Sequence, residues 1–275
     1  IQSRGPCVLV PTMGALHEGH KALIRQGADL AEAQNAPGGC VVTIFVNPTQ
    51  FNDPADFARY PKTLEADAQL CREAGAAAVF APEVGTVYPP NEPPPVPPLP
   101  EVATRPGLED AFRPGHFAGV CQVVHRLFDL CKPSAAVFGE KDWQQLQVIR
   151  AMAREQHLPI EIVSSPTIRE PDGLARSSRN RFIPEADRRA ATAISQALHL
   201  AGEQRSPAEA ETAMNRHLQA ASLAVEYAVV RDAQTLLAPA ADRPCRSLIA
   251  ARLGPVRLID NMPWPEASRS SASAS

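Results

Sequence analysis

Two histidines near the N-terminus, His17 and His20, stand on either side of Gly19 in an arrangement that could act on phosphates. They follow an apolar run, Val8–Val10, and a short turn that contains Gly14. This order predicts a strand, a turn and the start of a helix, where unpaired backbone N–H groups and the helix dipole can bind an anion. The imidazoles can then donate hydrogen bonds to charge that develops on a phosphate, while Gly19 leaves room for a base or a ribose.

Two other interpretations of the histidine pair stay open at this point. Three residues apart on a helix, His17 and His20 share a face and could ligate a metal, although the segment HEGH lacks the spacing of the zinc-protease pattern. They could also be ordinary surface histidines. Their position directly after a predicted strand favours the phosphate-binding interpretation.

Further polar residues follow other predicted strands. The segment GEKDW, residues 139–143, offers Lys141 as a mobile cation, and Gly139 would permit a tight turn; the alternative is a charged loop. The segment FVNPTQF places Asn47 and Gln50 at a strand end, where amides can orient a polar substrate or cap a turn. These positions extend the candidate site beyond the histidines.

Two more segments carry cations. RSSRN, residues 176–180, combines hydroxyl groups with guanidinium groups, which suits a triphosphate but is also common in a polar linker. RPGHF contains Arg113 and His116, which could bind an anion or cap the helix that follows. Alone, neither segment decides between these alternatives.

Composition limits the class of protein. The 275 residues suggest one large domain or two modest ones, and a hydrophobic content of 44% is ample for a core. A net charge of -3 disfavours nucleic acid as a partner. No apolar run approaches a membrane span. The start, IQSRGPC, does not resemble a signal peptide and has no initiator Met, so we expect the true N-terminus to be missing or processed. Six scattered cysteines without a Cys-x-x-Cys pair indicate a reducing compartment, the cytoplasm.

The first part of the chain alternates strands with helices. CVVTIFV, residues 40–46, is the continuous apolar run expected of a buried parallel strand. Repeated β-α-β units predict an α/β fold with a doubly wound, Rossmann-like parallel sheet, and ligands then bind outside the carboxyl ends of the strands. We expect strands at 8–10, 40–46, 78–80, 135–138 and 160–163, and helices at 21–33, 63–74, 120–131 and 143–156.

The sequence changes character at about Ile168. Helices at 184–202 and 207–221 and strands at 225–232, 247–253 and 256–260 predict a smaller α+β domain. We therefore expect a nucleotide-binding domain over 1–167, a C-terminal domain over 168–265 that acts as a lid, and a disordered Ser-rich tail over 266–275.

A proline-rich stretch, residues 89–100, cannot form a helix or a central strand. An extended surface loop is one interpretation, and a ligand for a proline-recognition domain is the other. The stretch lies away from the motifs along the chain.

From the residues alone, the chain is a nucleotide-using α/β enzyme without a P-loop or a Gly-x-Gly-x-x-Gly motif. In combination, however, its motifs resemble the pantoate–β-alanine ligase (pantothenate synthetase) family of the His-x-Gly-His nucleotidyltransferase superfamily. The matching segments span nearly the whole chain and occur in the family's order. They are PTMGALHEGH, TIFVNPTQF, DFARYPKTLEAD, RPGHFAGV, VFGEKDWQQLQVIR, DGLARSSRNRF and RLIDNMP.

The resemblance implies a two-step reaction. The carboxylate of pantoate attacks the α-phosphorus of ATP, which gives pantoyl adenylate and pyrophosphate. The amine of β-alanine then attacks the acyl carbon, which gives pantothenate and AMP. Adenylation supplies the leaving group that a free carboxylate lacks, and positioning and charge stabilise the transition state. The resemblance also implies Mg²⁺ and a homodimer.

The resemblance assigns roles to residues by position. The residues implied in catalysis are His17, His20 (in the slot usually described as a proton donor), Lys141 and Arg179. Those implied in ATP binding are also Met13, Gly14, Gly19, Gly139, Glu140, Asp142, Ile168, Arg176, Ser177 and Ser178. Those implied for pantoate and β-alanine are Gln50 and Gln145, with Asn47, Tyr60, Arg113 and His116. Asp67 is implied near magnesium.

Two rival functions remain at this stage. Another adenylyltransferase of the superfamily would use a different acceptor, but Gln50 and Gln145 favour a small hydroxy acid, because a phosphorylated substrate would call for arginines. A catalytically silent binding protein is the other rival, although every charged motif residue is present. One departure from the family pattern is Arg176, where the family usually has Met or Leu.

Overall fold

The computed structural model describes residues 5–50, 57, 60–61 and 63–265. The chain forms two compact units, residues 1–168 and 169–275. The predicted tail, 266–275, lies outside the described residues. Within the described part of the chain, no helix has the length and apolar character needed to cross a membrane.

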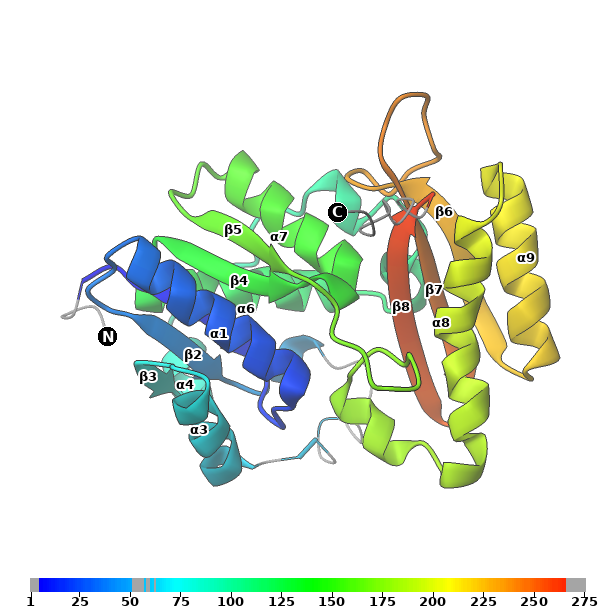
Figure 1. Ribbon diagram of the computed structural model, residues 1–275. Helices are drawn as coiled ribbons and strands as arrows, with labels where there is room; N and C mark the ends of the chain where they lie inside the picture. Colours follow the sequence, from blue (N-terminus) through cyan, green and yellow to red (C-terminus); the bar gives the residue numbers. More distant parts are fainter. Residues whose placement is uncertain (1–4, 51–56, 58–59, 62, 266–275) are drawn as a thin grey trace, which may run out of the picture. The chain divides into compact units, whose positions relative to one another are not determined.

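The first unit contains a five-stranded parallel sheet in the order β3-β2-β1-β4-β5 (Figure 1). The order reverses between β1 and β4, and such a switch point is where ligands bind in open α/β sheets. This arrangement confirms the predicted Rossmann-like fold. The strands are β1 (Val8–Thr12), β2 (Cys40–Ile44), β3 (Ala78–Phe80), β4 (Ala135–Gly139) and β5 (Glu161–Ser165).

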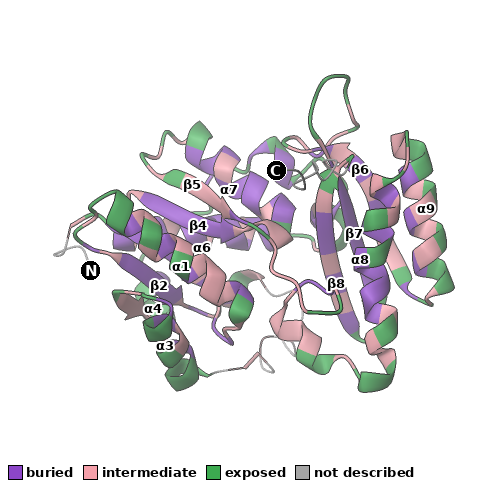
Figure 2. Cartoon of the chain, viewed as in Figure 1, coloured by how far each residue is buried: buried purple, intermediate pink, exposed green. Residues whose placement is uncertain are grey.

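Helices connect these strands and cover the sheet. In Figure 1, α1 lies in front of the sheet and α6 behind it. The three central strands are buried along almost their whole length (Figure 2), as expected when helices cover both faces. The helices are α1 (Glu18–Ala33), α3 (Leu64–Glu73), α4 (Val84–Val87), α5 (Glu109–Phe112), α6 (His116–Cys131) and α7 (Trp143–Glu155).

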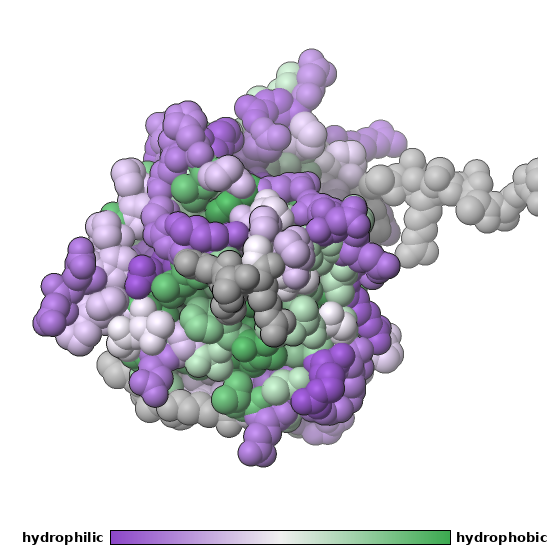
Figure 3. All heavy atoms as spheres, turned by 90° about the vertical axis from the view of Figure 1, so that its left-hand side faces the viewer, coloured by the Kyte–Doolittle hydropathy of each residue, from purple (hydrophilic) through white to green (hydrophobic). Residues whose placement is uncertain are grey.

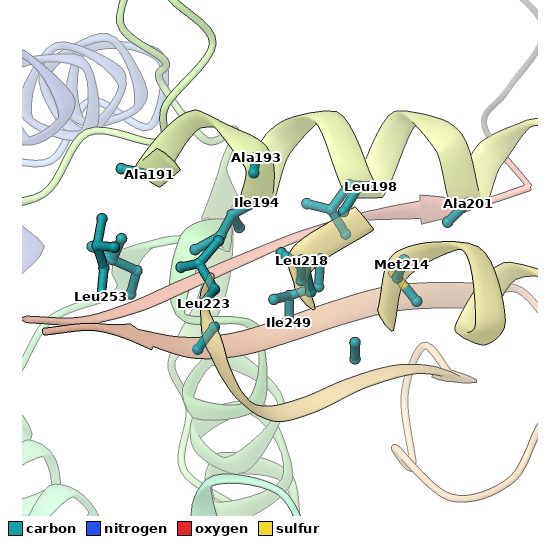
Figure 4. Packing of buried hydrophobic residues seen from close by; sticks show 14 of the residues in the cluster. Ala191, Ala193, Ile194, Leu198, Ala201, Met214, Leu218, Leu223, Ile249 and Leu253 are labelled. Carbon is teal, nitrogen blue, oxygen red and sulfur yellow. The ribbon is translucent and has the colours of Figure 1, made fainter. Parts of the chain in front are cut away.

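The second unit is the smaller α+β unit. Its strands form an antiparallel sheet in the order β6-β7-β8, and two helices pack on it. Figure 4 shows Ile194 and Leu198 of one helix facing Ile249 of the sheet, with Met214 and Leu218 of the other helix beside them. The elements are α8 (Arg188–Gly202), α9 (Pro207–Ala220), β6 (Ala224–Asp232), β7 (Cys245–Leu253) and β8 (Val256–Trp264).

The predicted elements are present, and their ends differ in a few places. The predicted helix 184–202 begins with a short 3-10 turn, Glu185–Asp187, before α8 starts, which is common at helix N-termini. Helix α6 begins at His116, four residues earlier than expected, and β8 continues to Trp264. The proline-rich stretch, 89–100, contains neither helix nor strand, as predicted.

Seen from the left-hand side of Figure 1, hydrophobic residues gather near the middle of the surface and hydrophilic residues surround them (Figure 3).

Candidate active site

The loop between β1 and α1 has a backbone that its sequence dictates. Gly14 has a φ of +81°, and a Cβ there would lie only 3.0 Å from Asp67 Oδ2. Ala15 has a φ of +50°, which is uncommon for a residue with a side chain. Thr12 Oγ1 accepts a hydrogen bond from the Gly14 N–H at 3.3 Å and donates one to the Thr43 carbonyl at 2.6 Å. The turn is therefore tied to both neighbouring strands.

A buried carboxylate, Asp67 of α3, anchors this loop. Its Oδ2 accepts from the Ala15 N–H at 3.0 Å and from Thr63 Oγ1 at 3.1 Å, and its Oδ1 accepts from the Leu16 N–H at 2.8 Å. Asp67 is only 3% exposed, so these bonds replace the water that the charge has lost. This geometry indicates a role in holding the loop, and the predicted role as a magnesium ligand stays a prediction.

The two histidines cap helix α1 reciprocally. The Gly19 N–H donates to His17 Nδ1 at 3.1 Å, and the His17 N–H donates to His20 Nδ1 at 3.3 Å. Their rings lie 4.1 Å apart, centroid to centroid. Because both Nδ1 atoms accept, the hydrogen-bond partners place the proton of each neutral imidazole on Nε2. Both rings are thus oriented to act as Nε2–H donors.

Burial keeps His20 neutral. Loss of hydration, opposed by the charge of Asp142 and assisted by that of Lys141, lowers the pKa of His20 to about 4. At neutral pH the residue is therefore a neutral hydrogen-bond donor. The influence of Lys141 and Asp142 also shows that the end of β4 lies near the histidine pair.

At the end of β2, amide groups form a connected network. Asn47 Nδ2 donates to Gln50 Oε1 at 3.1 Å, and Gln50 Nε2 donates to Met13 Sδ at 2.8 Å. His116, at the start of α6, lies 3.2 Å through Nδ1 from the Gln50 carbonyl oxygen. The structure thus brings Met13, Asn47, Gln50 and His116 together, next to the β1–α1 loop.

The histidine at the start of α6 is also neutral. Burial, assisted by the charge of Arg113, lowers the pKa of His116 to about 4. Arg113 itself lies 3.5 Å from the carboxylate of Glu109. Neither side chain caps α6, because its N-cap is Gly115 and no side chain makes the cap bond; the binding of substrate by Arg113 and His116 stays a prediction.

The end of β4 carries the charged candidates. Glu140–Asp142 form a 3-10 turn, in which the Lys141 ammonium lies 3.9 Å from Asp142 Oδ2. The tight turn expected after Gly139 is present, and a φ of −75° at Gly139 is a conformation that other residues can also adopt. Gln145 is half-buried in α7, and Tyr60 is half-buried in the chain between β2 and α3.

The second unit holds the remaining candidates. Ser177 caps the 3-10 turn Ser178–Phe182 by accepting from the Arg179 N–H at 3.2 Å. Arg176, Ser178 and Arg179 are partly exposed. Ile168 ends the first unit. The approach of these residues to a nucleotide stays a prediction.

Three residues that the sequence reasoning missed support the site. Thr12 and Thr63 hold the β1–α1 loop, and Tyr88 bonds to Asn47. A hydroxyl residue just before a glycine turn is a recognisable signal for Thr12. Thr63 bonds to Asp67 only four residues on, from the N-cap position of α3, whereas Tyr88 acts across 41 residues and no local pattern marks it.

Among the described residues, no group of three or more His, Cys, Asp and Glu side chains could hold a metal. Among those residues, the histidine pair therefore is not part of such a group. A parallel sheet with two Nε2–H donors at a helix N-terminus, beside its switch point, defines the class: a nucleotide-binding α/β protein.

Comparison with known proteins identifies the family within this class. Residues 2–263 match the family model described as pantoate-beta-alanine ligase. The chain is 46% identical to a pantothenate synthetase of Nocardioides over 95% of this chain and 80% of the relative. It is 48% identical to a pantothenate synthetase of Rubrobacter xylanophilus, with 94% and 90% covered.

Solved structures agree with the sequence relatives. Pantothenate synthetase from Thermus thermophilus has a TM-score of 0.85 at 41% identity, with 94% of this chain and 93% of that chain covered. Pantoate-beta-alanine ligase from Francisella tularensis, complexed with beta-gamma ATP and beta-alanine, has a TM-score of 0.73 at 32% identity, with 96% and 91% covered. The chain belongs to the pantoate–β-alanine ligase family.

Proposed function

We propose that the chain condenses pantoate with β-alanine at the expense of ATP, giving pantothenate, AMP and pyrophosphate. The family match over residues 2–263 supports the overall reaction. The reaction proceeds through pantoyl adenylate, whose formation needs charge stabilisation at the α-phosphate of the adenylyl group and on the departing pyrophosphate. The orientation of His17 and His20 is the single observation that carries this step.

In this mechanism the histidines donate hydrogen bonds to phosphate oxygens. Their Nδ1 atoms already accept backbone hydrogen bonds, so Nε2–H is the donor that each neutral ring would offer to a phosphate oxygen. A pKa of about 4 for His20 favours a neutral hydrogen-bond donor over a proton donor at neutral pH. The donors are fixed before substrate binds, so little reorganisation is needed as charge develops.

Other residues complete the proposed site. Lys141 neutralises phosphate charge beside the histidines, with Glu140, Asp142 and Gly139 near the nucleotide. Gln50 and Gln145 hold pantoate. Ser177, Ser178 and Arg179, with Arg176 and Ile168, contact the nucleotide from the C-terminal side, and the second unit serves as the lid.

Magnesium is part of the proposal. Mg²⁺ at ATP sites is bound largely by phosphates and water and needs only one or two protein carboxylates. Asp67 is the predicted protein ligand, although its oxygens already accept three hydrogen bonds. When bound, the ion would neutralise phosphate charge.

A homodimer and a cytoplasmic location are also proposed. The family resemblance supports the dimer, and sedimentation or light scattering of the purified chain would test it. All six cysteines carry free thiols, which suits a reducing compartment.

The test of the function measures the two half-reactions separately. Exchange of labelled pyrophosphate into ATP should require pantoate but not β-alanine, and AMP release should require both. Exchange that ignores pantoate would indicate another acceptor and a different adenylyltransferase. Absence of any exchange with intact ATP binding would indicate a silent binding protein.

A further inference from the structure

The side chain of Asn47 is buried and uses its amide entirely within the protein. Asn47 is 1% exposed, and its Nδ2 donates both to Gln50 Oε1 and to the Gly119 carbonyl, each at 3.1 Å. Its Oδ1 accepts from the backbone N–H of Thr49 at 3.3 Å and from Thr49 Oγ1 at 3.1 Å. The amide of Asn47 therefore orients Gln50 and has little capacity left for a substrate.

Tyr88 makes the shortest of the bonds to this amide. Its hydroxyl donates to Asn47 Oδ1 at 2.8 Å and lies 3.4 Å from Thr49 Oγ1. The ring of Tyr88 lies 6.1 Å from that of Phe45, centroid to centroid, at the end of β2. A continuous chain of hydrogen bonds thus runs from Tyr88 through Asn47 and Gln50 to Met13.

The segment that carries Tyr88 is held from behind by α6. Arg126 donates to the carbonyls of Thr86 and Val87 at 3.3 and 3.2 Å, and Gln122 donates to the Pro94 carbonyl at 2.6 Å. Prolines in the following stretch restrict the backbone further, because each fixes its own φ. The proline-rich stretch therefore begins beside the candidate site and continues a segment that α6 fixes in place.

Helix α6 also approaches the amide network directly. A Cβ at Gly119 would lie 2.6 Å from the Thr49 carbonyl oxygen, so only glycine allows the helix this close to the turn Pro48–Gln50. The same helix thus supports both ends of the Tyr88–Asn47 bond. Such support restricts the rotamers that the two amides can adopt.

We propose that Tyr88 is a positioning residue, which acts through Asn47 to hold Gln50 in the orientation that binds the hydroxy-acid substrate. This inference rests on the proposed function, because it takes Gln50 as the pantoate-binding residue. Burial raises the pKa of the Tyr88 hydroxyl, so the group remains a hydrogen-bond donor at neutral pH. Loss of this donor removes the shortest bond to the amide of Asn47 and so weakens the orientation that Asn47 imposes on Gln50.

The test uses Tyr88→Phe in the full chain, because this change keeps the ring and removes only the donor. We expect KM for pantoate to rise about fivefold to tenfold, the size of one lost hydrogen bond, while KM for ATP changes less than about twofold. Tyr227→Phe, the same chemical change in β6 of the second unit, is the matched control and should leave both constants unchanged. Melting temperatures of both variants check that the fold is intact.

A double-mutant cycle separates positioning from packing. If Tyr88 acts through Gln50, then Tyr88→Phe should have no further effect on KM for pantoate in a Gln50→Ala background. An additive effect, an equal rise in KM for ATP, or an unchanged KM for pantoate would each overturn the inference. If the unmodified chain shows no pantoate-dependent exchange, the proposed function itself fails, and that result is distinct from these three.

Discussion

Two loops with predicted phosphate-binding residues are held in different ways. The β1–α1 loop, residues 13–17, is fixed by a carboxylate that is 3% exposed, Asp67, and by the reciprocal histidine cap. The segment 169–182 of the second unit is held by a bidentate ion pair from Arg169 to Asp260, which is 3% exposed, and by further ion pairs nearer the surface. There Arg188 donates to Glu170 and Asp172, each at 2.7 Å, and all three side chains are about a quarter to a third exposed.

The difference has a physical consequence. Hydrogen bonds to a buried charge cost several kcal/mol to break, because the charge cannot regain water. Ion pairs near the surface are worth about 0–1 kcal/mol and weaken with added salt. The β1–α1 loop is therefore preorganised for its ligand, whereas the bonds from Arg188 to the segment 169–182 can break at low energetic cost.

The largest effect is expected from the preorganised loop. His20→Ala should lower kcat about 100-fold to 1000-fold, the usual effect of losing one fixed donor to a transition-state charge. KM for ATP should change much less, because the bond strengthens only as charge develops. Steady-state kinetics with both half-reactions measure this.

Two further variants sharpen that result. His20→Gln should recover part of the rate, because glutamine at this position can also accept the backbone N–H and keeps a donor. His125→Ala, in α6, changes a histidine that pairs with Asp129 and should leave kcat unchanged. An unchanged kcat for His20→Ala would contradict the role of the loop.

The pH dependence of stability follows from the two neutral histidines. Folding lowers the pKa values of His20 and His116 from 6.5 to about 4, so the unfolded chain binds more protons between these values. The free energy of unfolding therefore has its full value, as far as these two groups affect it, above pH 6.5, and it decreases as the pH falls toward 4. Each histidine accounts for up to about 3 kcal/mol of this decrease in the free energy of unfolding. For His20, which is partly exposed to solvent, this figure is an upper limit.

Urea unfolding between pH 4 and 8 measures this loss. In His116→Gln, the pH-dependent part of the unfolding free energy should shrink, since one of the two groups is gone. The rate of pyrophosphate exchange should show no step near pH 6.5 from His20. A step there that disappears in His20→Gln would mean that the residue titrates normally.

A variant of Asp67 can show whether this residue anchors the loop or ligates a metal. Asp67→Asn keeps one acceptor oxygen but replaces the other with a donor, which opposes the N–H groups of the loop. We expect KM for ATP to rise about tenfold and the unfolding free energy to fall by about 1–3 kcal/mol. Kinetics at rising Mg²⁺ decide between the two roles: a loop anchor gives a defect that magnesium cannot correct, whereas a ligand gives one that high magnesium reduces.

The fold and part of the site were predictable from local patterns. Apolar runs such as Cys40–Ile44 mark the parallel strands, and strand ends mark the positions of His17, Asn47 and Gln50. Each pattern lies within a few residues, and parallel topology then brings the strand ends together. Sequence reasoning therefore works where the cause of a structure is local.

The connections between these positions were not predictable in the same way. The bonds from Asp67 to Ala15 and from Tyr88 to Asn47 join residues 52 and 41 positions apart. Which acceptor a buried donor reaches depends on packing among several elements, and a single sequence does not contain that geometry explicitly. The protonation states of His20 and His116 depend on burial for the same reason.

The smallest effect is expected from the surface ion pairs of the second unit. Arg188→Ala removes both bonds to the segment 169–182, while Asn180 still donates to Glu170 at 2.8 Å and to the Ala175 carbonyl at 3.0 Å. KM for ATP should therefore rise no more than about fivefold, and raising the salt should bring the unmodified chain closer to the variant, because salt screens the same pairs. Measurement of KM for ATP at salt concentrations from about 0.05 M to about 1 M, over which screening goes from weak to strong, tests this expectation. If Arg188→Ala lowered activity as much as His20→Ala does, both loops would have to be equally preorganised.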